Sequence, residues 1–295
     1  MRLPPFELVE PESLAEACRL LGGGDAESRL LAGGTALVPM LRLGLVRPER
    51  LVSLARVPGL DGLRLEADAV RIGAMSAIAG LHRSATLRGG WPLLAEACGR
   101  VASPAIRSTA TLGGNLAYAE AASDVTPALL CLEAQVSVAG ESGERQVPIG
   151  EFFRGFYETA LEPGEVVTGV RLPRLIEGAR TGYVKFCPRS AEDKPLIGVA
   201  AVLVLDGAGR VATDVRIGLG GAAPTPLRAR RAEAALRGEP LGDPAIRAAA
   251  DAAAGEAEPL SDVMGSAEYR RDMIRVWVRR LLTGLRDGRA AHASG

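Results

Sequence analysis

The sequence has few of the side chains on which most hydrolases and metalloenzymes depend. It contains only two histidines, His82 and His292, and neither lies in a pattern that supports a metal site or a Ser-His-Asp triad. Aromatic residues make up 4% of the chain, which leaves few rings for stacking single-stranded bases. The 35 basic and 35 acidic side chains cancel, whereas nucleic-acid-binding domains usually carry a basic excess. We therefore expect neither a nucleic-acid partner nor a metal bound by this chain.

Cysteines are also few, and they are scattered. No two of the four lie within 30 residues of each other, which excludes a zinc knuckle, a CxxC redox pair and an iron–sulfur motif. Such isolated cysteines are typical of core residues in a reducing compartment. No apolar run approaches the roughly 18 residues that cross a bilayer, and a secretory signal is not expected. We predict a cytoplasmic location. The cysteines are Cys18, Cys98, Cys131 and Cys187.

Helices and hairpins alternate along the chain without a regular strand–helix–strand rhythm, which favours an α+β fold over a doubly wound sheet. Ser13 and Glu16 have the spacing of a capping box, and Ser76 can cap a helix that runs to His82. The composition shifts near Pro173, so we expect a domain boundary at about 174–180. The other predicted elements are hairpins over 63–74, 136–147 and 200–217, and helices over 14–21, 36–43, 93–101, 125–133 and 267–285.

Two glycine pairs stand in a context that suits a ligand. Leu31–Thr35 follows an apolar strand and opens a helix, so that successive backbone N–H groups could face an anion. Thr111–Asn115 offers a hydroxyl and an amide beside two bare glycines. Two such loops could clamp a pyrophosphate from both sides without a lysine. From composition alone, two ordinary turns are the more frequent outcome.

A third glycine-rich segment is a weaker candidate. Gly218–Ala223 matches the G-x-G-x-x-A pattern after a strand, but Pro224 and Pro226 interrupt the helix that should follow. We interpret it as a turn.

Charged residues give three further candidates. Asp124 could bind a polar ligand, cap the following helix, or do both. The only two lysines, Lys185 and Lys194, bracket a polar loop, and solvated surface charge is their simplest interpretation. The arginines of the helix over 267–285 oppose an apolar face. An amphipathic surface helix explains them best, a partner interface comes second, and RNA binding third.

At this point the chain resembles a known family. The segments LAGGTALVPMLRLGLVRPERLV and TATLGGNLAYAEAASDVTPALL look like those of the FAD-binding medium subunit of molybdenum hydroxylases, which include xanthine dehydrogenase and aerobic carbon monoxide dehydrogenase. The resemblance continues through VRIGLGGAAPTPLRARRAEAAL and SAEYRRDMIRVWVRRLL. The joint occurrence of AGGT and TLGGN, followed by SD-x-x-P, makes it specific.

The resemblance implies a fold of two parts. Residues 1–175 would form a two-lobed FAD-binding domain of the vanillyl-alcohol-oxidase (PCMH) type, with lobes of about 1–57 and 58–175. Residues 176–288 would form a small C-terminal domain with an antiparallel sheet and helices.

The resemblance also implies FAD-binding residues. One departure concerns Ala36, where many relatives carry a serine or an acidic residue, so that only its backbone N–H could reach the cofactor. The implied set is Ala32, Gly33, Gly34, Thr35, Ala36, Leu37, Val101, Ala102, Thr111, Leu112, Gly113, Gly114, Asn115, Asp124, Val167 and Lys185.

The implied function is electron transfer. A molybdenum subunit would oxidise the substrate, [2Fe–2S] clusters of a small subunit would relay electrons, and non-covalent FAD on this chain would pass them to an external acceptor. We expect a dimer of heterotrimers with no catalytic residue and no metal on this chain. Loop 187–195 would approach the flavin, where Lys194 or Asp193 could tune it. The alternatives are a stand-alone flavin-dependent reductase and a non-enzymatic nucleotide- or RNA-binding module.

Overall fold

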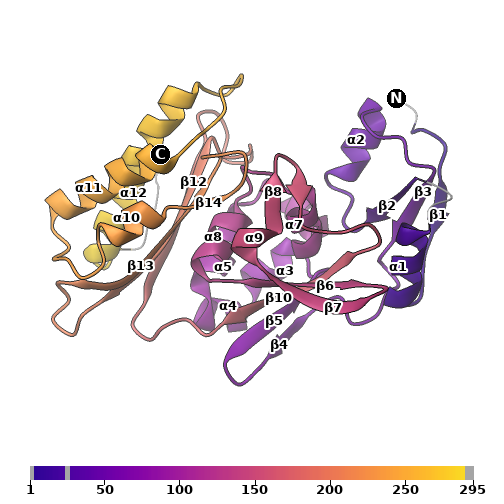
Figure 1. Ribbon diagram of the computed structural model, residues 1–295, viewed down its shortest axis with the longest axis horizontal. Helices are drawn as coiled ribbons and strands as arrows, with labels where there is room; N and C mark the ends of the chain where they lie inside the picture. The colour runs from indigo at the N-terminus through magenta and orange to yellow at the C-terminus, as the bar shows by residue number, and fades with distance from the viewer. Residues whose placement is uncertain (1–2, 24–26, 290–295) are drawn as a thin grey trace.

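The computed structural model describes residues 3–23 and 27–289. Figure 1 shows an elongated molecule in which an N-terminal lobe, a middle body and a C-terminal sheet with its helices follow one another along the long axis. Each part has its own hydrophobic core. Within the described residues, no helix has the length and apolar character needed to cross a membrane.

The N-terminal lobe is built on a three-stranded parallel sheet in the order β1-β3-β2. The Ser13 hydroxyl accepts a hydrogen bond from the N–H of Glu16 at 3.2 Å, which confirms the predicted start of the first helix. That helix buries Ala17 and Cys18 against Val52. The elements are β1 (Glu7–Val9), α1 (Leu14–Gly22), β2 (Ser28–Leu31), α2 (Leu37–Leu43) and β3 (Arg50–Ser53).

The middle body contains a five-stranded antiparallel sheet in the order β4-β5-β10-β6-β7. Its strands are β4 (Leu63–Leu65), β5 (Ala69–Gly73), β6 (Gln135–Gly140), β7 (Gly143–Pro148) and β10 (Val166–Pro173), with a small separate hairpin of β8 (Phe153–Gly155) and β9 (Glu158–Thr159). Its helices are α3 (Ile78–Arg83), α4 (Ala85–Gly90), α5 (Pro92–Arg100), α6 (Pro104–Thr109), α7 (Leu112–Tyr118), α8 (Val125–Cys131) and α9 (Ile149–Phe152).

The C-terminal sheet is antiparallel, in the order β11-β12-β13-β14, and helices cover both of its faces. Along β12, Ala200 and Val202 face the middle body, whereas Val199, Ala201 and Leu203 face the C-terminal helices. A strand buried on both faces is apolar throughout, as the sequence IGVAAVLVL is. The elements are β11 (Arg180–Phe186), β12 (Ile197–Leu205), β13 (Ala212–Gly220), β14 (Leu227–Arg228), α10 (Arg230–Ala234), α11 (Asp243–Glu256) and α12 (Ala267–Arg286).

Helix α8 of the middle body packs directly on this sheet, because two glycines of β13 leave room for it. A Cβ on Gly218 would lie 2.3 Å from the carbonyl oxygen of Pro127, and one on Gly220 would lie 3.0 Å from the Pro127 ring. The interpretation of 218–223 as a turn was therefore wrong for its first three residues. The strand continues through Gly220, and the turn begins at Gly221, whose φ is +68°.

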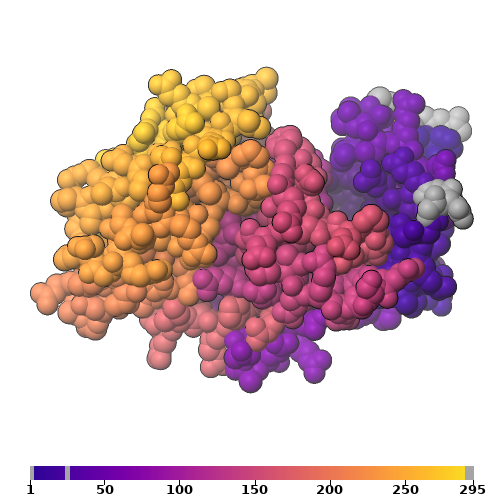
Figure 2. All heavy atoms as spheres, viewed as in Figure 1, coloured from indigo at the N-terminus to yellow at the C-terminus, as the bar shows by residue number. Residues whose placement is uncertain are grey.

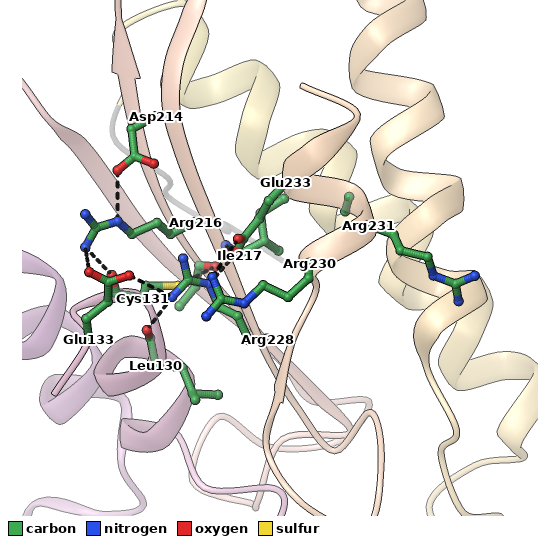
Figure 3. Close-up of polar contacts among 12 residues, drawn as sticks. Leu130, Cys131, Glu133, Asp214, Arg216, Ile217, Arg228, Arg230, Arg231 and Glu233 are labelled. Atoms are coloured by element: carbon green, nitrogen blue, oxygen red, sulfur yellow. Dashed lines mark hydrogen bonds and ion pairs between the residues drawn. The ribbon is translucent and has the colours of Figure 1, made fainter. Parts of the chain in front are cut away.

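Two arginines of the sheet hold the C-terminal end of α8, as Figure 3 shows. Arg216 donates to the carbonyl of Cys131 at 3.3 Å, and Arg228 donates to that of Leu130 at 2.9 Å. The last carbonyls of a helix have no partner within the helix and carry partial negative charge, which cations compensate. Arg228 also pairs with the buried carboxylate of Glu233, which accepts the N–H of Ile217 at 2.9 Å.

The predicted hairpins over 63–74, 136–147 and 200–217 are confirmed by strand pairing. The predicted cap at Ser76 was wrong, because its hydroxyl instead bonds the N–H and carbonyl of Gly62, at 3.0 and 3.2 Å, and α3 begins only at Ile78.

The contact between α8 and β13 gives a prediction. We expect Gly218→Ala to lower the free energy of unfolding by about 1–3 kcal/mol, because the added methyl group meets rigid backbone. Gly255→Ala is the control, since a Cβ there meets nothing within 4 Å. Urea unfolding measures both. Equal midpoints for the two variants would contradict a close approach at Gly218.

Candidate functional site

A cavity of about 360 Å³ lies between the N-terminal lobe and the middle body. Figure 2 shows the two meeting at a notch between the indigo and magenta surfaces. The two glycine loops, 80 residues apart in the sequence, form opposite walls of this cavity. Of the residues implied by the family resemblance, those that line it are Ala32, Gly33, Gly34, Thr35, Ala36, Leu37, Thr111, Gly113, Gly114, Asn115 and Val167.

The first loop offers free hydrogen-bond donors. Within the described parts of the chain, the backbone N–H groups of residues 33–36 donate to no other group. Gly34 has a φ of +69°, a conformation that side chains disfavour. A Cβ on Gly33 would lie 2.0 Å from the carbonyl oxygen of Thr109, so Gly33 allows the two walls to touch. The sequence argument gave Gly33 a different task, which was to leave space for a phosphate.

The donors of the second loop are already used. The N–H groups of Leu112 and Gly113 bond the carbonyls of Ser76 and Ala74 at 3.1 and 2.8 Å, and the N–H of Gly114 bonds the Thr111 hydroxyl at 3.1 Å. With these N–H groups already bonded, this loop can offer a ligand its glycine surface, the Asn115 side chain and the proton of the Thr111 hydroxyl. Free backbone donors therefore lie on one wall of the cavity, whereas the sequence suggested that both loops would bind a pyrophosphate.

Leu112, Val101 and Ala102 lie outside the cavity wall. Leu112 is fully buried in the core. Val101 and Ala102 follow α5, where Arg107 donates to both of their carbonyls at 2.6 and 2.5 Å. Ala102 has a φ of +37°, so this arginine holds a strained backbone segment in place.

Asp124 and Lys185 meet in a second, buried polar group. Their ion pair measures 3.0 Å, and their side chains are 7% and 5% exposed. Asp124 also accepts the Tyr183 hydroxyl at 2.8 Å, while Lys185 donates to the carbonyl of Arg100 at 2.8 Å. The interpretation of Lys185 as a solvated surface charge was wrong, because its partner lies far away in the sequence. The cap role of Asp124 was also wrong, since Ser123 bonds the N–H of Val125 instead, at 3.3 Å.

Burial decides the protonation of this group. It raises the pKa of Asp124 to about 6, although Lys185 and the Tyr183 hydroxyl oppose that shift. Burial likewise raises the pKa of Glu96, which accepts the N–H of Tyr183 at 3.1 Å, to about 7. A buried charge is stable only where partners satisfy it, so the ion pair ties α8 firmly to β11.

One hydrogen bond joins the two groups of predicted residues. Ser123 donates from its hydroxyl to the Asn115 side-chain oxygen at 2.8 Å, and Ser123 adjoins Asp124 in the sequence. The chain Asn115–Ser123–Asp124 thus runs from the cavity wall to the buried ion pair.

Loop 187–195 reaches the rim of the cavity. Lys194 pairs with Glu120, and its ammonium lies 5.5 Å from the centre of the Tyr118 ring, which lines the cavity. Tyr157 donates to the same carboxylate of Glu120 at 2.8 Å. Asp193 lies 3.5 Å from Arg189 instead.

Sequence reasoning missed Tyr118 and Tyr183. Tyr118 could have been found from its place within GGNLAY, one helical turn beyond Gly114. No local signal marks Tyr183, whose partner Asp124 is remote in the chain. In the described residues, no cluster of three or more histidine, cysteine or carboxylate side chains is arranged to hold a metal ion.

The buried group gives a prediction about pH. Tyr183→Phe removes a donor that stabilises the ionised Asp124 carboxylate, so we expect the pKa of Asp124 to rise above about 6. A carboxyl group with a raised pKa in the folded state stabilises the fold at low pH and loses that contribution as pH rises through the folded pKa. In the variant, the decline of stability with pH should therefore extend to higher pH.

Urea midpoints between about pH 4 and pH 8 measure this decline. Tyr269→Phe, at a residue that is 39% exposed, is the matched control. A Tyr183→Phe profile parallel to that of the wild type would show that this hydroxyl does not control the carboxyl group.

Two family descriptions match the chain. Residues 4–175 match the FAD binding domain in molybdopterin dehydrogenase, and residues 182–285 match the CO dehydrogenase flavoprotein C-terminal domain.

Named proteins are similar over nearly the whole length. The carbon monoxide dehydrogenase medium chain of Hydrogenophaga pseudoflava is 37% identical over 95% of this chain and 96% of its own. Subunit alpha of the 6-hydroxypseudooxynicotine dehydrogenase complex of Paenarthrobacter nicotinovorans is 36% identical over 96% of this chain and 95% of its own. The structure of carbon monoxide dehydrogenase from H. pseudoflava matches with a TM-score of 0.94 and 38% identity, over 98% of this chain and 100% of that chain.

These matches confirm both the family resemblance and the α+β fold that it implied. The chain belongs to the family of FAD-binding medium subunits of molybdenum hydroxylases, whose members are parts of oxidoreductases.

Proposed function

We propose that the cavity between the two glycine loops holds FAD, with the cofactor's pyrophosphate on the first loop. The free N–H groups of residues 33–36 carry this proposal, because a concentration of unpaired backbone donors suits an anion. Gly113 and Gly114 line the opposite wall, and Asn115 beside them offers its amide. Among the described residues that line the cavity, the one basic side chain is that of Arg29, which pairs with Glu27 at 3.5 Å, so we assign the main part of the recognition to the backbone donors.

The remaining predicted residues would surround the flavin ring. Val167 lies in the cavity wall, while Asp124, Lys185, Val101 and Ala102 cluster around the end of α5. When bound, FAD supplies the capacity to accept and release electrons, and the protein orients it and adjusts its electrostatic surroundings. The rigid ion pair of Asp124 and Lys185 would set that electrostatic environment.

Binding would be non-covalent. Histidine and cysteine are common attachment points for covalent flavin, and neither is among the described residues that line the cavity. The described cysteines are free thiols, and three of them are buried, which supports the cytoplasmic location that we propose.

We further propose the electron route of the family. Electrons would arrive from [2Fe–2S] clusters of a small partner subunit, after a molybdenum subunit has oxidised the substrate, and would leave through FAD to an external acceptor. The relatives' names, medium chain and complex subunit alpha, support a multi-subunit assembly, and a dimer of heterotrimers is our proposed form. Two relatives of nearly equal identity belong to enzymes named for different substrates, which supports substrate selection by a partner chain.

The three cores suggest matching units. We propose lobes of about 1–57 and 58–175 for the FAD-binding domain and 176–288 for the C-terminal domain. Tyr183 and Ala200, which belong to the core of the middle body, would then form part of the contact between the two domains.

Non-covalent FAD is tested by precipitation. The purified chain, together with its co-expressed partners, should be yellow, and acid should release the colour into the supernatant. Colour that stays with the protein pellet would contradict non-covalent binding, and a colourless complex would contradict the proposed function.

The first loop is tested by Gly33→Ala. The added methyl group must push Thr109 away, which separates the two walls, so we expect FAD affinity to fall at least about tenfold. Gly80→Ala, whose Cβ would meet nothing within 4 Å, is the control and should bind FAD normally. Quenching of flavin fluorescence measures both variants. If Gly33→Ala binds FAD with wild-type affinity and circular dichroism shows an intact fold, the first loop is not part of the FAD site.

A further inference from the structure

A second cavity, of about 440 Å³, opens between α11 and α12, on the far side of the C-terminal sheet from α8. Its lining contains five arginines and two aspartates, Asp243 and Asp287, a local excess of three positive charges in a chain with no net charge. We call it the arginine basin. Its arginines are Arg247, Arg279, Arg280, Arg286 and Arg289.

Two of these arginines are neutralised within the chain. Arg286 pairs with Asp243 at 2.5 Å and with Asp287 at 2.8 Å, and Arg289 lies 3.7 Å from Asp287. Arg247, Arg279 and Arg280 have no carboxylate at ion-pair distance among the described residues. Arg280 instead lies over the ring of Trp277, at 4.8 Å from its centre.

Amphipathic packing accounts for α12 but not for the basin. The buried face of the helix, which includes Ile274, Val278 and Leu281, fixes the helix on the sheet and directs Arg279 and Arg280 outward. Arg247 comes from a different helix, yet it lines the same cavity. Converging like charges repel one another, so this arrangement costs stability unless an anion compensates it.

We propose that the arginine basin docks a carboxylate-rich segment of a partner subunit. This inference rests on the proposed function in one respect, which is that the chain works within a complex. Arg279 and Arg280 are exposed, and the cavity is open, which suits a protein surface better than an enclosed small anion. Nucleic acid is disfavoured, because the whole chain has no basic excess, and among the described residues the one ring that contacts these unpaired arginines is that of Trp277.

Such a surface acts mainly on recognition. Complementary charge steers two subunits together and fixes their register, so it raises the association rate more than it slows dissociation. The effect weakens with salt, because exposed charges are screened. A charged basin on the C-terminal helices would therefore govern assembly without touching the FAD cavity.

The test replaces the three unpaired arginines together. In Arg247→Gln/Arg279→Gln/Arg280→Gln we expect the association rate with the co-expressed partner subunits to fall about tenfold at low salt and to lose most of its salt dependence. FAD content should be unchanged. The control is Arg64→Gln/Arg83→Gln/Arg154→Gln, which removes three exposed arginines elsewhere on the chain and the same charge. Equal rates and equal salt dependence in the two triple variants would overturn the proposal.

Binding of inorganic phosphate provides a second test of the proposal. Binding of phosphate to the wild type but not to the basin variant, with assembly unaffected, would overturn the proposal in favour of a small-anion site. A shift in Trp277 fluorescence when the partners bind, absent in the basin variant, would support docking at this site. A wild-type chain that neither binds FAD nor assembles would count against the proposed function, whereas a basin variant that assembles normally with FAD counts only against the basin.

Discussion

The structure depends on the contact of one short helix, α8, with the C-terminal sheet. Gly218 and Gly220 remove the side chains that would keep the helix away. Polar and charged groups of the sheet then hold both of its ends: Lys185 and Tyr183 at Asp124, and two arginines at its last carbonyls. Because the interior of this contact is apolar, each of these polar groups must be satisfied, and the relative placement of the helix and sheet is narrowly defined.

This contact reaches the candidate cofactor site through a few covalent and hydrogen bonds. Asp124 directly precedes α8, its neighbour Ser123 bonds Asn115, and Asn115 lies in the cavity wall. On the other side, Lys194 of loop 187–195 pairs with Glu120 beside the Tyr118 ring. The C-terminal sheet is therefore part of the framework of the site, although most of the cavity is made by the first half of the chain. If FAD binds as we propose, both parts of the chain contribute to its position.

Local patterns predicted the local structure. The hairpins, the capped first helix, the long last helix and the two glycine loops depend on neighbouring residues, and the sequence shows them directly. The parallel sheet β1-β3-β2 pairs strands that are far apart in the chain, so no pattern marked it. Burial of Lys185 was missed because its partner, Asp124, precedes it by 61 residues. The sequence also could not show that the first loop has free N–H groups and the second does not. The N–H groups of Leu112 and Gly113 bond Ser76 and Ala74, which only the fold brings near.

The central claim is that free backbone N–H groups of the first loop recognise FAD, while the second loop supplies surface. Hydrogen–deuterium exchange with and without FAD tests it most directly, because exchange reports each amide separately. The account predicts that FAD slows exchange at residues 33–36 and leaves that of residues 112–114, which are already bonded, nearly unchanged. Protection confined to residues 112–114, or unchanged exchange at residues 33–36 in the FAD-bound protein, would contradict it.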